Sequence, residues 1–169
     1  MEKEKGPEAL NSLKQSLNNS LQYTNFFDYP IQEFNLLSVA AGKILLPNKS
    51  PDKQLYEIGK IMMKSILSSP LTKKIVPLFE KNFKSALQHM PFFYRQVLSF
   101  ANITIETLGE NSRKIIYKDF KSHPQVEHGV LTQAAYLLKP DAQITFFEKL
   151  TTNDQQGNIV SQFECIIQW

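Results

Sequence analysis

The last third of the chain alternates apolar and polar residues in two pairs of short runs, with a helical pattern between them. Ile103 and Ile105 open the first pair, which turns at residues 109–111. The last run places apolar residues at every second position: Phe163, Cys165, Ile167 and Trp169. A period of two indicates strands that are buried on one face. Residues 126–138 follow the helical period instead, so this region predicts a hairpin, a helix and a second hairpin.

Earlier in the chain, apolar residues recur every three or four positions, which is the helical period. Pro30 and Pro51 each open such a stretch, and proline suits a first helical turn. A further stretch runs from 71 to 89, and we expect Pro91 to end it. Helices first and sheet second is the order of an α+β domain. The pattern therefore predicts N-terminal helices packed on a four-stranded antiparallel sheet, with a hairpin–helix–hairpin C-terminal half.

Length and composition fit an ordinary folded domain. The 169 residues are 42% hydrophobic and 21% charged, which excludes wholesale disorder and suits a single core. We expect a flexible N-terminus at residues 1–7 and one α+β domain over residues 8–169. The net charge of +3 is too small to indicate a nucleic-acid partner, and none is expected.

The single cysteine, Cys165, excludes an intrachain disulfide framework and a cysteine-based zinc site. It lies on the same face of its strand as Phe163 and Ile167, so we expect a buried, structural thiol. The N-terminus lacks the apolar core of a signal peptide. No apolar run approaches the ~20 residues of a membrane span. The sequence thus favours a soluble, cytoplasmic protein without a transmembrane segment.

Two histidines flank a segment that offers metal-binding groups. His123 and His128, with Glu127 beside them, do not have the spacing that places two ligands on one helix face. We therefore interpret them as solvated loop histidines and predict no metal site. Gly129 follows them, and glycine costs about 1 kcal/mol in a helix interior. We expect it to mark close packing of the helix against the sheet, with a frayed first turn as the alternative.

One cluster near the middle of the chain is the best candidate for ligand binding. His89 ends an apolar helical stretch, where it could serve as a haem ligand or a pocket donor, or simply favour the helix dipole. The aromatic residues after it could line a cavity between helices and sheet, or fill the core. The candidate ligand-binding residues are His89, Phe92, Phe93 and Tyr94.

Motifs for catalysis are absent from the sequence. It has no Gly-x-Ser-x-Gly, no phosphate-binding glycine loop and no Rossmann fingerprint. Acidic residues are scattered, with no evident catalytic pair. We therefore predict no catalytic residue, and we expect a protein that is not an enzyme.

Several weak motifs, in a consistent order from about Tyr23 to the end of the chain, resemble an uncharacterised family. That family is catalogued as a domain of unknown function and is best represented in myxobacteria. The segments that carry the resemblance are Tyr29-Pro30, Leu46-Pro47, Leu55 to Lys60, Met90 to Arg95, Asn102 to Ile105, Gly129 to Leu131 and Ile167 to Trp169. The chain departs from the family at Ser65 and Ser69, where more glycine is expected. The family offers no catalytic residue to carry over.

The order of elements is also similar to a broader group of ligand-binding domains. The group includes haem-based nitric-oxide sensors, 4-vinyl-reductase-like domains and small subunits of the TRAPP tethering complex. In these, helices pack on an antiparallel sheet and hydrophobic ligands can enter between them, so the resemblance implies a sensing or assembly module. The haem sensors carry a Tyr-x-Ser-x-Arg motif, whereas residues 123–127 read His-Pro-Gln-Val-Glu here. The missing motif argues against haem.

Together these observations favour a non-enzymatic regulatory or sensor module without a cofactor. Its expected partner is a small hydrophobic ligand or another protein. The main alternative is a structural adaptor or assembly subunit that works through a protein–protein interface, including self-association as a homo-oligomer. A haem- or porphyrin-binding protein is the minor alternative.

Overall fold

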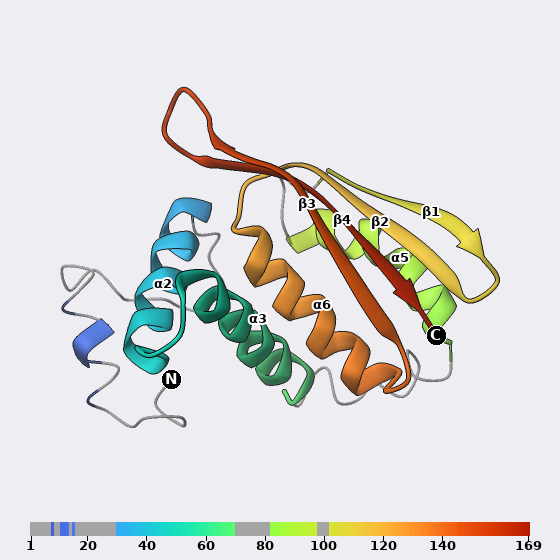
Figure 1. Ribbon diagram of the computed structural model, residues 1–169, viewed down its shortest axis with the longest axis horizontal. Helices are drawn as coiled ribbons and strands as arrows, with labels where there is room; N and C mark the ends of the chain where they lie inside the picture. Colours follow the sequence, from blue (N-terminus) through green and yellow to red (C-terminus); the bar gives the residue numbers. More distant parts are fainter. Residues whose placement is uncertain (1–7, 9–10, 14, 16–29, 70–81, 98–101) are drawn as a thin grey trace.

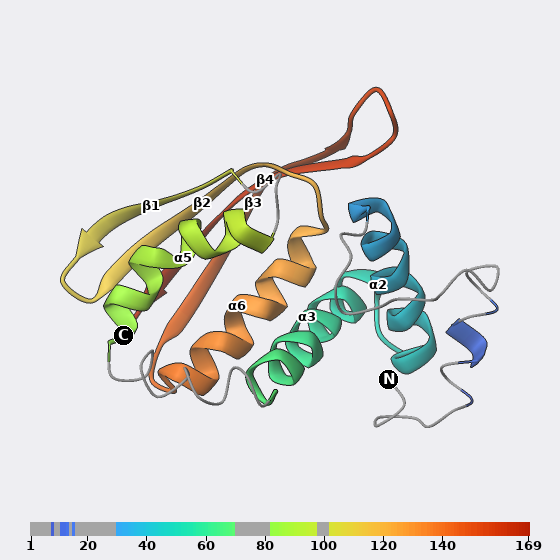
Figure 2. The same cartoon turned by 180° about the vertical axis from the view of Figure 1, so that it is seen from behind.

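The computed structural model describes residues 8, 11–13, 15, 30–69, 82–97 and 102–169. Their four strands form one sheet, and helices cover one of its faces (Figure 1). Helix α5 (Phe83–Val97) packs on β1, and α6 (Pro124–Leu138) packs on β3 and β4. Farther from the sheet, α3 (Pro51–Leu67) packs on α6, and α2 (Ile31–Leu45) packs on α3 (Figure 2). This arrangement confirms the predicted α+β architecture.

The sheet is antiparallel throughout, with the strand order β1-β2-β4-β3. Its strands are β1 (Asn102–Gly109), β2 (Ser112–Phe120), β3 (Gln143–Asn153) and β4 (Ile159–Gln168). Tyr117 lies opposite Phe163, and Ile115 lies opposite Cys165, on the face that meets the helices. Cys165 is fully buried, which confirms the prediction of an enclosed thiol. The predicted hairpin–helix–hairpin order is also confirmed, with α6 connecting β2 to β3.

Helix α5 corrects one expectation from the sequence, because it continues through Pro91 and ends at Val97. Proline removes one helical hydrogen bond and crowds the preceding turn. Packing of Leu87, Met90 and Tyr94 against the core offsets that cost. Residues 90–94 therefore belong to a helix and do not lead directly into the first strand. The part of the predicted helix at 71–81 lies outside the described residues.

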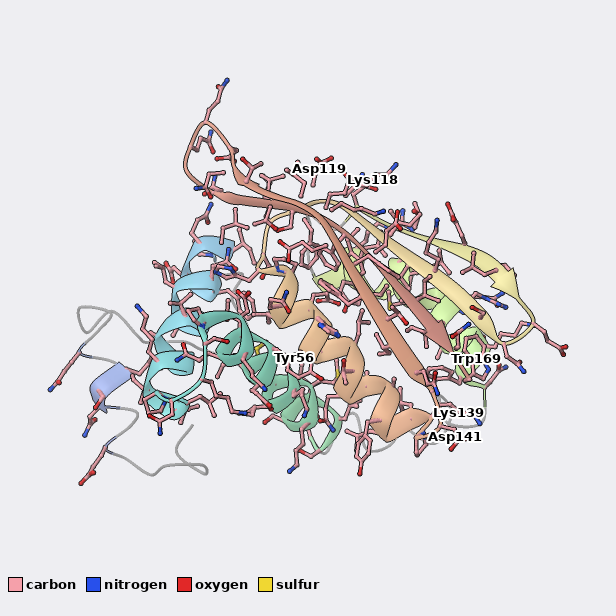
Figure 3. The ribbon with its side chains drawn as sticks, viewed as in Figure 1. Tyr56, Lys118, Asp119, Lys139, Asp141 and Trp169 are labelled. Carbon is pink, nitrogen blue, oxygen red and sulfur yellow. The ribbon has the colours of Figure 1, made fainter. Side chains whose placement is uncertain are left out.

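A break in the regular alternation of β2 lets two aromatic side chains of this strand enter the core. The register with β4 shifts between Tyr117 and Phe120, and Asp119 has φ 51°. Left-handed backbone is uncommon outside glycine, although aspartate tolerates it better than most residues. Figure 3 shows Lys118 and Asp119 on the outer side of the sheet. Phe120 is consequently buried with Tyr117, and each of their rings also contacts Phe163.

The contact between α3 and α6 is made by two glycines at the crossing point. A Cβ on Gly59 would lie 2.0 Å from the Val126 carbonyl oxygen, and one on Gly129 would lie 1.9 Å from the Tyr56 carbonyl oxygen. Both positions therefore require glycine, because any side chain would overlap the backbone of the other helix. Gly129 does mark close packing, as expected, but its neighbour is helix α3 and not the sheet.

Candidate functional site

Three consecutive residues of α6 face three different neighbours, and they place this helix at the centre of the candidate site. Glu127 points toward α5 and the sheet, where it bonds to tyrosines of α5 and β2. The ring of His128 stacks on Phe146 of β3. Gly129 contacts the backbone of α3. Successive residues of an α-helix are turned by about 100°, which explains how adjacent positions reach three partners.

The first part of the site is a buried carboxyl group held by two phenols. Tyr94 Oη and Tyr117 Oη both donate to Glu127 Oε1, the latter over 2.9 Å. Glu127 is 6% exposed and Tyr117 is fully buried. Buried carboxyl groups need hydrogen-bond partners, because removal from water is costly for a charged or polar group. The cluster therefore links α5, α6 and β2 through one carboxylate oxygen.

The electrostatics of this cluster bring a proton equilibrium close to neutral pH. Burial raises the pKa of Glu127 to about 7, while the hydrogen bonds from Tyr94 and Tyr117 act in the opposite direction. Burial, followed by the nearby Glu127 charge, raises the pKa of both tyrosines well above the ordinary value. Both phenols therefore remain protonated donors. A carboxyl group poised near pH 7 is a frequent property of functional sites.

Cys165 lies close to this carboxyl group but is not a reactive thiol. Its pKa is raised, first by burial and then by the charge of Glu127. Nucleophilic cysteines need a lowered pKa and access to solvent. The thiol therefore serves as a small apolar side chain of the core.

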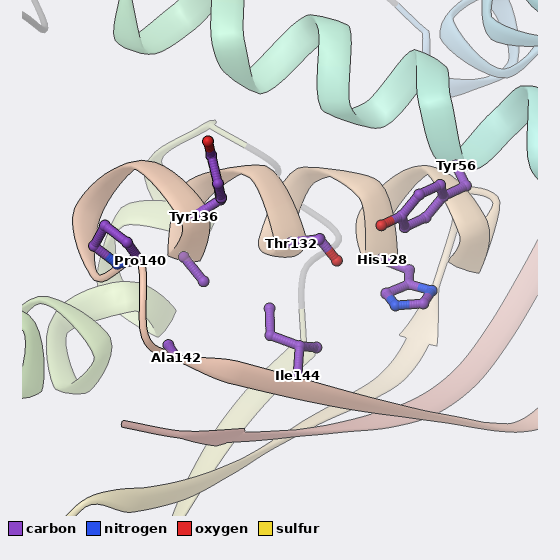
Figure 4. Close-up of a pocket in the computed structure, with 8 residues that line it drawn as sticks. Tyr56, His128, Thr132, Tyr136, Pro140, Ala142 and Ile144 are labelled. Atoms are coloured by element: carbon purple, nitrogen blue, oxygen red, sulfur yellow. The ribbon is translucent and has the colours of Figure 1, made fainter.

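The second part of the site is a pocket on another side of α6, where that helix meets α3 and the start of β3 (Figure 4). Its volume is about 220 Å³, smaller than the ~300–1,000 Å³ typical of sites for drug-sized ligands. The residues that line it are Tyr56, His128, Thr132, Ala135, Tyr136, Pro140, Ala142 and Ile144. None of these described residues carries a fixed charge.

The polar groups of the pocket are held in place but are incompletely bonded. The His128 ring stacks on Phe146 with centroids 4.4 Å apart, and the Tyr56 ring meets His128 edge-on at 4.9 Å. Burial lowers the pKa of His128, so its ring is neutral at pH 7. The Thr132 hydroxyl oxygen is buried and has no hydrogen-bond partner. A buried hydroxyl without a partner is costly, which makes this atom the clearest unmet polar group in the pocket.

The four residues predicted to bind a ligand lie on one helix, but the structure does not gather them around this pocket. His89 is exposed, and its Nδ1 lies 2.8 Å from the carbonyl oxygen of Ser85 in the same helix. Phe92 is 56% exposed, and the side chain of Phe93 lies outside the described part. Tyr94 is bonded to Glu127 in the core. Of the three whose side chains are described, Tyr94 is therefore the one that enters the site described above.

The segment from 123 to 128 corrects a second expectation. His123 and His128 are half-buried rather than solvated, His123 immediately before α6 and His128 within it. Glu127 turns away from both, toward the tyrosines. Among the described residues, no group of three acidic, histidine or cysteine side chains could hold a metal ion.

Sequence patterns contained a signal for part of this site. Glu127 precedes Val130 by three positions and Leu131 by four, so it shares their apolar face. An acid on the buried face of a helix needs a partner, and this predicts a polar cluster. Thr132 lies one turn after His128, but nothing in the sequence indicates that Tyr56 of α3 would join them.

The described residues do not fit a haem. His89 faces away from the core on an exposed part of α5. Tyr94, Tyr117 and Glu127 bond together in the interior between α5 and the sheet, and Phe163 stacks on Tyr117 there. The pocket beside α6 is small, and its one histidine is stacked against a neighbouring ring. The chain also has no Tyr-x-Ser-x-Arg sequence at any position.

Solved structures with a similar fold include H-NOX domains. A Cs H-NOX mutant with an unnatural amino acid is 12% identical with a TM-score of 0.69, over 99% of this chain and 89% of that one. A mutant H-NOX of T. Tengcongensis is 11% identical with a TM-score of 0.68, over 99% and 90%. The IWP-051-bound H-NOX from Shewanella woodyi, in the Fe(II)CO state, is 20% identical with a TM-score of 0.62, over 96% and 86%. At these identities the likeness shows an H-NOX-like fold and no more.

The family is shown by the sequence itself. Residues 4–148 match the family described as "Protein of unknown function (DUF2378)", and the chain belongs to it. This confirms the resemblance to an uncharacterised family, and the H-NOX structures confirm the resemblance to the haem-sensor group at the level of fold. No curated protein matches the chain significantly. Within the described part, no helix is both long and apolar enough to cross a membrane.

Proposed function

We propose that this protein is a non-enzymatic regulatory module that uses an H-NOX-like fold without haem. The observation that carries the proposal is the Tyr94–Glu127–Tyr117 cluster, which together with the apolar core occupies the space between α5 and the sheet. A fold by itself is a weak guide to function. Here the fold supports a sensor-like module. The hydrogen-bonded cluster in the interior supports a module without haem.

The proposed mechanism is a change in how α5 is held against α6 and the sheet. The cluster joins three elements through Glu127, so any ligand or partner that displaces α6 alters these bonds. A ligand shifts an equilibrium only by binding one arrangement more tightly than another. The module would therefore report occupancy through the position of α5, whose outward side carries exposed Phe92.

Native mass spectrometry of the full chain, purified from its native host, tests the proposal directly. We expect a retained small molecule or a co-purifying protein, and no haem. A stable monomer with no bound molecule and no partner would contradict the regulatory assignment.

Absorption spectroscopy after addition of haemin tests the absence of a haem site. We expect no Soret band beyond that of free haemin. A specific band that is lost in His89→Ala, but kept in the control Gln88→Ala at a neighbouring exposed position, would overturn the haem-free proposal.

A second candidate function, an assembly subunit, is favoured by apolar side chains on one edge of the sheet. Phe147 and Leu150 of edge strand β3 are 43% and 55% exposed. Exposed edge strands and apolar patches are common sites of association. If this candidate is correct, light scattering will show an oligomer that Phe147→Ser and Leu150→Ser weaken. The control Leu36→Ser, an exposed position on α2, should leave the mass unchanged.

A further inference from the structure

We infer that the pocket between α3, α6 and β3 binds a small uncharged aromatic compound that carries one hydrogen-bond acceptor. The inference names a site and a ligand class for the module proposed above, and it relies on that proposal only for the regulatory consequence of binding. The pocket is separate from the Glu127 cluster, which lies on another side of α6.

The shape and surface of the pocket indicate an aromatic occupant. Three aromatic rings line it, those of Tyr56, His128 and Tyr136, and the other lining side chains are small or aliphatic apart from the hydroxyl of Thr132. Aromatic rings favour stacked and edge-on contacts with other rings. A volume of about 220 Å³ suits a compound of one ring rather than a larger ligand. Figure 4 shows the Tyr56 and Thr132 hydroxyls directed toward the same part of the pocket.

The arrangement of charges around the pocket favours a neutral ligand over an ionised one. No Asp, Glu, Lys or Arg is among the lining residues, and burial lowers the pKa of His128, the one titrating imidazole there. Lys139 and Asp141, at the rim, are paired with each other over 3.2 Å. Lys60 lies over the outer face of the Tyr56 ring and pairs with Glu57. A buried charge without a partner is strongly unfavourable, so a neutral compound fits best.

Thr132 supplies the requirement for an acceptor. Its hydroxyl is buried without a partner, although a threonine in a helix can bond to the carbonyl one turn earlier. A carbonyl oxygen or ring nitrogen on the ligand would accept this hydrogen bond. One such bond changes affinity by about fivefold, the effect of roughly 1 kcal/mol.

Three probes of similar size separate the features of the proposed ligand. Acetophenone is neutral and has an acceptor, ethylbenzene is neutral without one, and benzoate has acceptors but is charged. Binding of each to the full chain is followed by ligand-observed NMR. We expect acetophenone to bind more tightly than ethylbenzene by about fivefold, and benzoate to bind least. Equal binding of benzoate, or no binding of any probe, would overturn the inference.

Substitution of Thr132 tests whether the preference comes from its hydroxyl. Thr132→Val keeps the shape, should remove the preference for acetophenone over ethylbenzene, and should raise the unfolding midpoint of the free protein. Thr145→Val is the matched control, because Thr145 is exposed on the strand beside Ile144, and it should change neither result. A preference that survives in Thr132→Val would mark adventitious binding only and would refute the site.

A second variant covers the case in which Thr132→Val does not fold. Ala142→Leu narrows the pocket from the start of β3 and should reduce the binding of acetophenone and ethylbenzene alike. Unchanged binding would place the probes elsewhere and contradict the inference. These results are independent of the native-host experiment: failure here removes this ligand class, whereas a monomer without any bound molecule there removes the regulatory module itself.

Discussion

Helix α6 is held in two different ways on two of its sides. Against α3 the contact is backbone to backbone, with Gly59 and Gly129 each admitting a carbonyl of the other helix. Against α5 and the sheet the contact is a hydrogen-bonded carboxyl group, Glu127. The glycine contact between α6 and α3 leaves no room for the two backbones to shift toward each other. The hydrogen bonds of Glu127 change in strength with the protonation state of its carboxyl group. We therefore expect pH to affect the contacts on the α5 side of α6 and not the glycine contact with α3.

Breaking the glycine contact should have the largest effect on stability. Gly129→Ala places a methyl group about where the Tyr56 carbonyl oxygen lies, so the helices must separate. We expect a loss of about 3 kcal/mol or more in the free energy of unfolding, at the upper end for overpacked cores. Urea denaturation measures it, with Gly59→Ala expected to match.

The control for this substitution is Gly109→Ala. A Cβ there would meet only the Ser112 Cβ, at 4.0 Å, and should change stability by less than about 0.5 kcal/mol. An equally small loss of stability for Gly129→Ala would show that the α3–α6 contact does not require glycine at this position.

The contribution of Glu127 to the free energy of unfolding should depend on pH, whereas that of the contact between Gly59 and Gly129 should not. Glu127 has a pKa of about 7 when folded, against an ordinary 4.5, so the folded state binds more protons between these values. Stability contributed by this group is therefore present below pH 4.5 and lost as the pH rises to 7, by up to about 3 kcal/mol.

Unfolding of wild type and Glu127→Gln between pH 4.5 and pH 7.5 measures this effect. The difference between the two curves isolates Glu127, because His123 and His128, whose lowered pKa values act with the opposite sign, remain in both proteins. Parallel curves would show that Glu127 does not titrate in this window.

Removal of one phenol should have a smaller effect that depends on the same proton. Tyr117→Phe takes a donor from Glu127 and should cost about 2 kcal/mol above pH 7, where the acceptor is charged, and less at pH 5. Tyr136→Phe, at a position 65% exposed, should be neutral by comparison. A cost that is the same at both pH values would indicate lost packing rather than a lost bond to a charge.

The smallest effect is expected at the periphery. Gln32 of α2 donates to Asn158 in the β3–β4 loop over 2.6 Å, on the surface. Gln32→Ala should cost at most about 0.5 kcal/mol in thermal or urea unfolding. A larger loss would mean that the contact between α2 and the β3–β4 loop contributes substantially to stability, in addition to the packing of α6 on the sheet.

The sequence predicts the elements of this fold better than it predicts their partners. Period-two runs such as Phe163 to Ile167 locate the strands, because each residue reports its own face of the sheet. Pro91 misleads, since its local cost is outweighed by packing that the local pattern does not contain. Tyr56 and Thr132 lie 76 positions apart in the chain, and only the α3–α6 crossing brings them to one pocket.

The adjacency of Glu127, His128 and Gly129 has a mechanical consequence. All three anchors lie within about 3 Å along the helix axis. Tyr136 lies about 12 Å farther along the axis, at the pocket end. Between these levels Leu131 and Ala135 are buried, whereas Tyr136 and Leu137 are exposed. A displacement of α6 at the level of the anchors would therefore strain its contacts with α5, β2, β3 and α3 together.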